Sequence, residues 1–407
     1  MPMWPHSEVD AAARALKAHE ARFGEAKAVC SAPATWSLIG EHTDHSGGVV
    51  LMALADIRCT VAVTPRADRT FVVREIYREE PSGELVERES TCEAVAPNAE
   101  EATARSTAER IAGLVHTMMH RQMLSRETAG FDVTMVNDIP ASAGLGATVA
   151  LDVAAALAFA SHLEDLTSAP VKTKLAEVCF QSSQAFSPAP EVRARYTAAL
   201  RGHSDAMNVI DYSDGSITQA TNPVGPAAGT VALAVVPPRG TARVEEVARR
   251  NGFIDQAAHA FGAENLQLLP DASTRVIDWL RAVHDVLGPE GVPLVEEASL
   301  WLQFMDKETA DAKAVTAAIR SRRLGELYPV LARSQSHLAD LLQLTDVDFT
   351  VAQLCLARGA LSARSAEAGT STAVIALVDG SHAENFAADL SGDGFTVIEL
   401  VDGQPAC

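Results

Sequence analysis

Residues 38–48 read Leu-Ile-Gly-Glu-His-Thr-Asp-His-Ser-Gly-Gly. The glycines and short polar residues of this stretch predict a tight turn before the next strand. The side chains of Glu41, His42, Asp44 and His45 suit three roles: metal ligands, acceptors for hydroxyl groups, or a solvated turn. A sugar site needs carboxylate and imidazole acceptors on a rigid backbone, because the wrong epimer leaves such groups unpaired. The stretch alone leaves all three roles open.

A second stretch, residues 140–148, reads Pro-Ala-Ser-Ala-Gly-Leu-Gly-Ala-Thr. It lies between the strand-like Phe131–Val136 and the Ala-rich helical pattern Thr148–His162. Glycines let backbone N–H groups approach phosphate oxygens, and a helix N-terminus favours an anion. No lysine follows Gly146, so this is not a Walker A loop. Taken alone, the stretch fits a phosphate loop or a plain strand-to-helix connection.

A third stretch, Gly-His-Ser-Asp at residues 202–205, precedes the strand-like Val209–Asp211. A carboxylate at Asp205 suits the orientation or deprotonation of a hydroxyl group during phosphoryl transfer. An isolated aspartate in a turn is also an ordinary cap. By itself this stretch does not choose between the two.

The length and composition favour a folded protein with two lobes. The chain has 407 residues, of which 47% are hydrophobic and 21% charged, and this length exceeds what one core usually serves. The proline- and glycine-rich Thr221–Gly229 is the clearest composition break, so we predict an N-terminal lobe over 1–222 and a C-terminal lobe over 223–407. The second lobe begins with the strand-like Val231–Val236 and is then largely helical, which predicts an α+β architecture.

The charge balance excludes some classes of partner. With 33 Lys and Arg against 53 Asp and Glu, the formal net charge is −20, which repels nucleic acid and anionic membrane surfaces. The six cysteines show no metal-ligand spacing and are few for a disulfide scaffold, so we expect a cytoplasmic protein. No apolar run reaches the roughly 18 residues that a membrane span needs.

In this order the three stretches resemble the motifs of the GHMP small-molecule kinases. Residues 40–48, GEHTDHSGG, closely resemble the galactokinase signature GEHTDYNGG, with His45 and Ser46 in place of Tyr and Asn. Residues 140–148 are similar to the phosphate loop PxxxGLSSS, and residues 202–205 to the motif GxxD. The resemblance implies a two-lobed α+β GHMP kinase fold with the active-site cleft between the N- and C-terminal lobes.

The resemblance also implies a reaction: ATP and Mg²⁺ phosphorylate the C1 hydroxyl of galactose or a related hexose. Carried over by position, catalysis falls to Asp205 and to position 35, here Thr35. The remaining implied positions bind small molecules. The sugar would be bound by Glu41, His42, Asp44 and Gly202, the nucleotide by Gly144, Leu145, Gly146, Ala147 and Thr148, and the metal by Thr148 and Gln184.

The departures from the family pattern gather on the nucleotide side. Thr35 stands where the family has an arginine. The loss of that arginine removes a cation that would stabilise phosphoryl charge. Gln184 stands where the family has a metal-binding glutamate, and Glu191 in the longer segment that follows is a candidate substitute. Ala147 replaces a loop serine, residues 362–370 replace a glycine cluster, and the family's sugar-binding tyrosine has no match in 244–250. The sequence therefore predicts an eroded ATP and Mg²⁺ site with weak or lost activity; the alternative is a non-catalytic sugar-binding or regulatory protein that acts through a protein partner.

Overall fold

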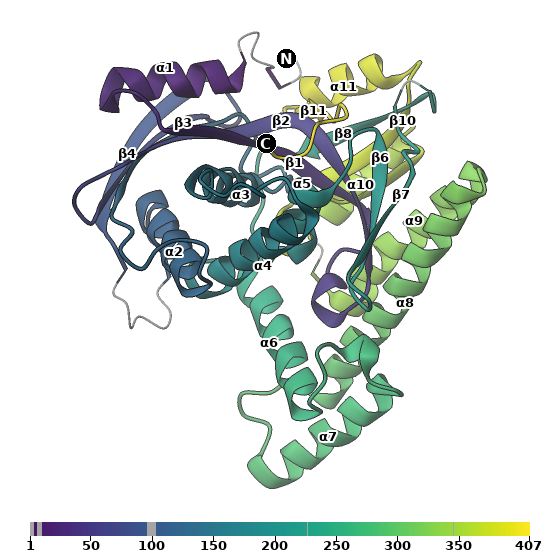
Figure 1. Ribbon diagram of the computed structural model, residues 1–407. Coiled ribbons are helices and arrows are strands. Elements are labelled where there is room, and N and C mark those ends of the chain that lie inside the picture. The colour runs from purple at the N-terminus through teal and green to yellow at the C-terminus, as the bar shows by residue number, and fades with distance from the viewer. Residues whose placement is uncertain (1–3, 6–9, 96–102, 226, 345) are drawn as a thin grey trace. The chain divides into compact units, whose positions relative to one another are not determined.

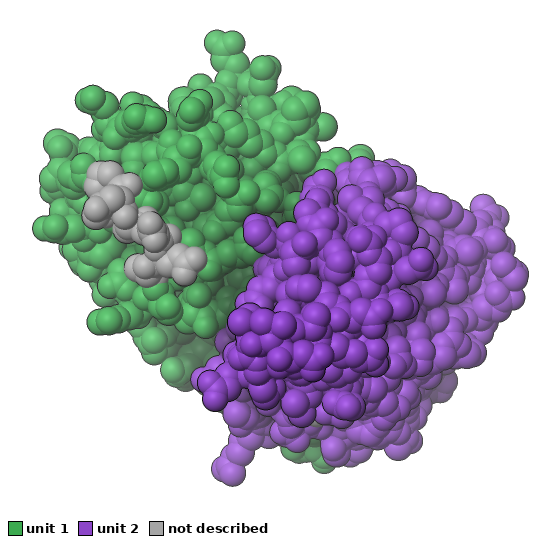
Figure 2. Space-filling view, turned by 90° about the horizontal axis from the view of Figure 1, so that it is seen from below, with its two compact units in different colours: residues 1–36, 53–205, 390–407 green, residues 37–52, 206–389 purple. Residues whose placement is uncertain are grey.

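The computed structural model describes residues 4–5, 10–95, 103–225, 227–344 and 346–407 (Figure 1). The chain forms two compact units, coloured separately in Figure 2. Unit 1 comprises Met1–Trp36, Ala53–Asp205 and Leu390–Cys407, and unit 2 comprises Ser37–Met52 and Ala206–Asp389. The predicted α+β class is confirmed. The expected lobe boundary at 222/223 lies between strands β7 (Ser216–Thr221) and β8 (Thr230–Val236), within unit 2.

Unit 1 is a sheet with helices on both faces. Its strands follow the order β4 (Leu85–Glu93), β3 (Thr70–Arg78), β5 (Phe131–Asn137) and β2 (Val49–Pro65), and β1 (Ala28–Ile39) also pairs with β2. The β3–β5 pair is parallel, whereas β3–β4 and β2–β5 are antiparallel. Helix α1 (Ala11–Phe23) covers one face, and the other face is covered by α2 (Thr107–His120), α3 (Ala147–Phe159), α4 (Ala169–Phe186) and α5 (Arg193–Arg201) (Figure 1). Strand β11 (Thr396–Glu399) completes the unit.

Helix α3 is the centre of the helical layer of unit 1. Every residue from Val149 to Phe159 is buried, as its Ala-rich, nearly uncharged sequence predicts. Its one carboxylate, Asp152, accepts hydrogen bonds from Arg110 at 2.8 and 2.7 Å and from the Tyr196 hydroxyl at 2.8 Å. A buried carboxylate is tolerated when its lone pairs are satisfied in this way, so α3 is fixed against α2 and α5.

Unit 2 combines short strands with long helices. The N-terminal part of β2, Val49–Met52, pairs with β6 (Ala206–Asp211), and β6 pairs with β7. A separate set of antiparallel strands has the order β8, β10 (Val374–Asp379), β9 (Ser362–Ser365). The helices are α6 (Val244–Ala260), α7 (Ala272–Leu287), α8 (Val295–Arg320), α9 (Leu327–His337), α10 (Val347–Ala357) and α11 (Ala383–Gly392), the last of which ends in unit 1; the short helical turns are η1 (Asp44–Ser46), η2 (Leu266–Leu268), η3 (Leu324–Glu326) and η4 (Leu338–Leu342).

Helices α6, α7 and α8 share one apolar core. Phe253, Val276, Leu280, Trp301 and Phe304 are buried together in it. Burial of side chains of this size contributes roughly 1.5–3 kcal/mol each, so the three helices are firmly positioned relative to one another. Two of these helices carry side chains that reach the motif turn described next.

Candidate functional site

The motif turn at residues 40–48 leaves β1 and returns into β2 within unit 2. Gly40 has a φ of +91°, and a Cβ atom there would lie 2.1 Å from the carbonyl oxygen of Val49, so only glycine fits. The Thr43 hydroxyl donates to the carbonyl oxygen of Gly40 at 2.8 Å, and the Gly48 N–H donates to the carbonyl oxygen of Thr43 at 2.8 Å. The turn is therefore a rigid support for the polar side chains that it carries.

Glu41 is buried with one carboxylate oxygen unused. Its side chain is almost inaccessible, and Oε1 accepts the Ala368 N–H at 2.6 Å. Among the described residues Oε2 has no hydrogen-bond partner, and the Arg364 guanidinium lies 3.8 Å from it. Burial raises the pKa of Glu41 to about 7, against the opposing effects of Arg364 and the Ala368 N–H. Glu41 can thus offer a ligand either a carboxylate acceptor or a carboxylic acid donor.

Both ring nitrogens of His42 contact protein groups. Arg250 Nη2 donates to Nδ1 at 2.9 Å, so Nδ1 is the acceptor nitrogen. Nε2 therefore carries the hydrogen and donates to the carbonyl oxygen of Ala368 at 2.8 Å. This pairing assigns the neutral Nε2–H tautomer and fixes the plane of the ring. His42 links the turn, α6 and the segment after β9.

Arg250, on α6, is a site residue that the sequence did not reveal. Its side chain is buried, and Nε and Nη1 have no hydrogen-bond partner among the described residues. Burial lowers the pKa of Arg250 to about 10, and the nearby carboxylates Asp44 and Glu41 oppose that shift. The sequence showed only that residues 244–250 lack the family's sugar-binding tyrosine. In the structure, Arg250 from that segment contacts His42 of the motif turn.

Asp44 begins the short helix η1 and is buried. Its Oδ1 accepts the N–H of His45 at 3.0 Å. A carboxylate in the first turn of a helix is favoured by the local N–H dipoles. The His45 ring in turn lies 2.7 Å from the carboxylate of Asp255 on α6. Two residues of the turn therefore contact α6: His42 through Arg250, and His45 through Asp255.

A buried carboxylate, Glu308 on α8, holds the base of the turn. It accepts the Gly40 N–H at 2.9 Å, Arg364 Nη2 at 3.1 Å and the Ser334 hydroxyl at 2.5 Å. Arg364, on β9, also donates to the carbonyl oxygen of Leu38 at 2.9 Å. The segment 362–370, which lacks the expected glycines, supplies Arg364 and Ala368 to this network. Its contribution could not be read from composition.

In unit 1, residues 140–148 join β5 to α3. Gly144 and Gly146 have positive φ values of +64° and +71°, and α3 begins at Ala147. Thr148 is exposed in the first turn of α3, and its hydroxyl donates to Glu191 Oε1 at 2.7 Å. Gln184 is exposed on α4. The carboxylate beside Thr148 therefore belongs to Glu191.

Two further groups complete the polar surroundings of this loop. Arg110 Nη2 donates to Glu191 Oε1 at 3.1 Å. Arg195, on α5, is buried and donates from Nη1 to the Thr35 hydroxyl at 3.1 Å and to the Thr35 carbonyl oxygen, and from Nη2 to the Gly144 carbonyl oxygen at 2.6 Å. Asp205 lies at the end of unit 1, exposed, with a φ of +55°, just after the buried Gly202. The structure thus brings Thr35 and the 140–148 loop together through Arg195.

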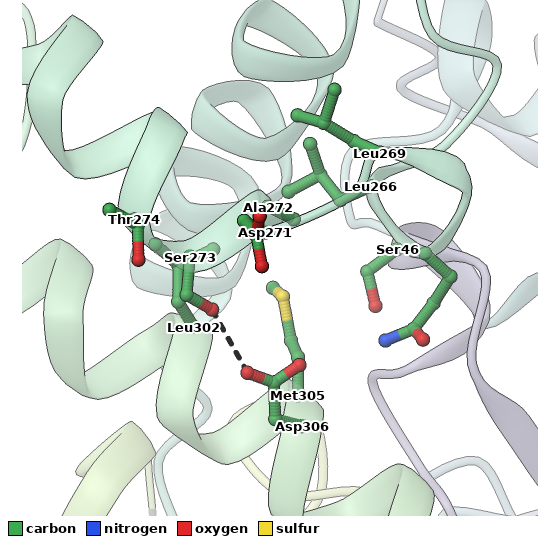
Figure 3. Close-up of a pocket in the computed structure, with 11 residues that line it drawn as sticks. Ser46, Leu266, Leu269, Asp271, Ala272, Ser273, Thr274, Leu302, Met305 and Asp306 are labelled. Atoms are coloured by element: carbon green, nitrogen blue, oxygen red, sulfur yellow. Dashed lines mark hydrogen bonds between the residues drawn. The ribbon is translucent and has the colours of Figure 1, made fainter.

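A cavity of about 360 Å³ lies on another side of the motif turn in unit 2 (Figure 3). Ser46, at the end of η1, forms part of its wall, and Asp271 and Ser273 contribute from the start of α7. The Ser273 hydroxyl donates to Asp306 of α8 at 2.9 Å, as Figure 3 shows. The described lining residues do not include Glu41, so this cavity is separate from the Glu41 carboxylate.

Comparisons with known proteins agree with the motifs. The family model described as the galactokinase galactose-binding signature matches residues 17–65, which contain the turn. A galactokinase of Streptomyces coelicolor is 26% identical over 87% of this chain and 85% of its own length, and a galactokinase of Roseiflexus sp. is 25% identical over 89% and 86%. The structure of Lactococcus lactis galactokinase complexed with galactose superposes with a TM-score of 0.73, at 17% identity, over 97% of this chain and 99% of that one.

The chain is similar to galactokinases in its motif turn and in sequence over most of its length, and it shares the fold of the Lactococcus lactis galactokinase. The predicted family and fold are therefore confirmed. No helix among the described residues is long and apolar enough to cross a membrane. The roles assigned from the resemblance to individual residues remain predictions.

One cluster of metal-ligating side chains occurs in the described part of this kinase. Atoms of Glu308, Asp311 and His337 lie within 4.8 Å of one another. Both oxygens of Glu308 already accept hydrogen bonds, and Arg333 binds both oxygens of Asp311. These contacts account for the carboxylates of this cluster structurally.

Proposed function

We propose that this chain is a sugar kinase that phosphorylates the C1 hydroxyl of galactose or a related hexose, with ATP as donor and Mg²⁺ as cofactor. The observation that carries the proposal is the 2.7 Å contact between the Thr148 hydroxyl and Glu191 at the start of α3. It places two hard oxygen donors beside a glycine-containing loop and a helix N-terminus, which together favour a metal-bound triphosphate. The proposal therefore assigns to Glu191 the metal-ligand role that the resemblance implied for Gln184, and Arg110, which donates to the same carboxylate oxygen at 3.1 Å, would have to share it with the metal.

The sugar side of the proposal rests on the motif turn. Discrimination among hydroxyl groups requires fixed polar groups whose loss of a partner is costly. Within the described part of the chain, Glu41 Oε2 is buried with no hydrogen-bond partner, and Asp44 is positioned in η1 near the Arg250 guanidinium. His42 contributes through its bonds to Arg250 and Ala368, which set the geometry of the turn. The galactose in the Lactococcus lactis complex makes galactose the first sugar to test.

In the proposed mechanism each group has a separate task. Thr148 and Glu191 would hold Mg²⁺, which neutralises phosphate charge when bound. The N–H groups at the start of α3 would favour the anionic phosphates of the donor through the helix dipole. Asp205 orients the C1 hydroxyl and accepts its proton as the phosphoryl group is transferred, with no covalent enzyme intermediate.

A coupled ADP-release assay with Mg·ATP and galactose tests the proposal. We expect release that depends on both sugar and metal, and a large loss of release in Glu191→Gln. Gln184→Ala serves as the matched control, because Gln184 is exposed and lies outside the Thr148 contact. Galactose binding by calorimetry without any ADP release would contradict the kinase proposal and support the non-catalytic sugar-binding alternative.

A further inference from the structure

Compared with the family pattern, the chain lacks an arginine at position 35 and a glutamate at position 184. The segment between α4 and Gly202 carries one residue of each charge near the 140–148 loop. Glu191 lies just before α5 and contacts Thr148. Arg195 lies one helical turn later and contacts Thr35. Residues four positions apart lie on the same side of a helix or its entrance, so one short segment delivers an anion and a cation to neighbouring parts of the loop.

Arg195 is built into the loop. Its side chain is 1% exposed, yet it donates to oxygens of both Thr35 and Gly144, so the cost of burying its charge is offset by charge-assisted hydrogen bonds. A Cβ atom at Gly146 would lie 3.0 Å from Arg195 Cδ and 3.1 Å from the Thr35 hydroxyl. The absence of a side chain at Gly146 therefore lets the arginine pass directly beneath the loop.

We propose that Arg195 replaces the arginine missing at position 35, as a positioning residue for the loop that binds the triphosphate. This inference rests on the nucleotide site of the proposed function. The guanidinium fixes the Gly144 peptide and Thr35 in one arrangement, and its positive charge beneath Gly146 favours the anionic phosphates of a nucleoside triphosphate. The cation expected at position 35 is then supplied by a residue 160 positions later in the chain. On this proposal, the loss of arginine at position 35 does not erode the nucleotide site.

Calorimetric titration with Mg·ATP, in the absence of sugar, tests the proposal directly. We expect Arg195→Met to weaken ATP binding by about tenfold and to leave galactose affinity unchanged. Arg195→Lys keeps the charge without the planar guanidinium. Its affinity for ATP should therefore fall between that of the wild-type protein and that of Arg195→Met. Arg193→Met is the matched control on the same helix, since Arg193 pairs with Glu177 at the surface.

A swap variant separates loss of the cation from loss of folding. Thr35→Arg combined with Arg195→Ala returns the guanidinium to position 35, and we expect it to recover ATP affinity relative to Arg195→Ala. Equal impairment of Lys, Met and swap variants would overturn the proposal, as would unchanged ATP affinity in a folded Arg195→Met protein. Wild-type protein that binds ATP without transferring phosphate would contradict the kinase proposal alone, whereas wild-type protein that does not bind ATP would contradict both.

Discussion

Glu41→Gln should remove a pH dependence of stability that the motif turn imposes. In the folded protein, burial raises the pKa of Glu41 from 4.5 to about 7, so the fold holds this proton more tightly than the unfolded chain does. The stabilising contribution is fully present below about pH 4.5 and is lost as the pH rises through about 7. Glutamine has nearly the same shape, accepts the Ala368 N–H, and does not titrate.

The magnitude follows from the size of the shift. One pKa unit corresponds to about 1.4 kcal/mol, so the shift from 4.5 to about 7 amounts to roughly 3 kcal/mol. Relative to Glu41→Gln, the wild-type free energy of unfolding should therefore fall by about 3 kcal/mol between pH 4 and pH 8. Taking the difference between the two proteins cancels the titration of groups that they share.

Urea unfolding at a series of pH values measures this difference. A sugar hydroxyl that donates to Glu41 would stabilise the carboxylate, so saturating galactose should move the midpoint of the difference curve below pH 7. Mannitol at the same concentration controls for solvent effects. Parallel stability curves, with a difference that stays within about 0.5 kcal/mol from pH 4 to pH 8, would refute the reasoning about the buried carboxyl group.

Three further substitutions test other parts of the structure. Glu308→Ala should lower the free energy of unfolding by about 3–5 kcal/mol, because it removes the nearer of the two carboxylates beside the buried Arg364; a loss below about 1 kcal/mol in urea unfolding would contradict this. Gly146→Ala should destabilise the protein by at least about 1 kcal/mol and weaken ATP binding, since φ is +71° and Arg195 lies beneath; unchanged calorimetric affinity would show that the loop tolerates a Cβ atom. Glu191→Gln should raise the Mg²⁺ concentration needed for half-maximal ADP release at least several-fold, while an equal requirement in both proteins would remove Glu191 from the metal site.

The motif turn shows how far local sequence can go. Gly40 and the polar residues after it lie within nine consecutive residues, 40–48, that lead directly into the next strand. The whole pattern can therefore be seen in one short stretch of sequence. The resemblance therefore predicted the family, the α+β class and the location of Glu41 and Asp44, and it also found the glycine loop before α3. It assigned Gln184 to the metal from its position in a pattern, although the chain between α4 and Gly202 is longer than the pattern.

Other site residues had no local signal. Arg250 is one of two arginines on α6 and Arg195 is one of three on α5, and the sequence does not distinguish a buried guanidinium from a solvated one. Glu308 is one acidic residue among several on α8, and only packing makes it the acceptor for Gly40 and Arg364. The glycine-poor segment 362–370 suggested a lost function, whereas it supplies contacts to the motif turn.

Local sequence was enough to predict a turn that resembles the galactokinase signature and a loop that resembles the GHMP phosphate loop, because both depend on backbone conformations that nearby glycines allow. The tertiary structure decided which charges serve them. Thr35 and Arg195 are 160 residues apart, and His42 and Arg250 are 208 apart. Contacts over such separations form only when helices pack and exclude water, since burial makes each charge require a specific partner.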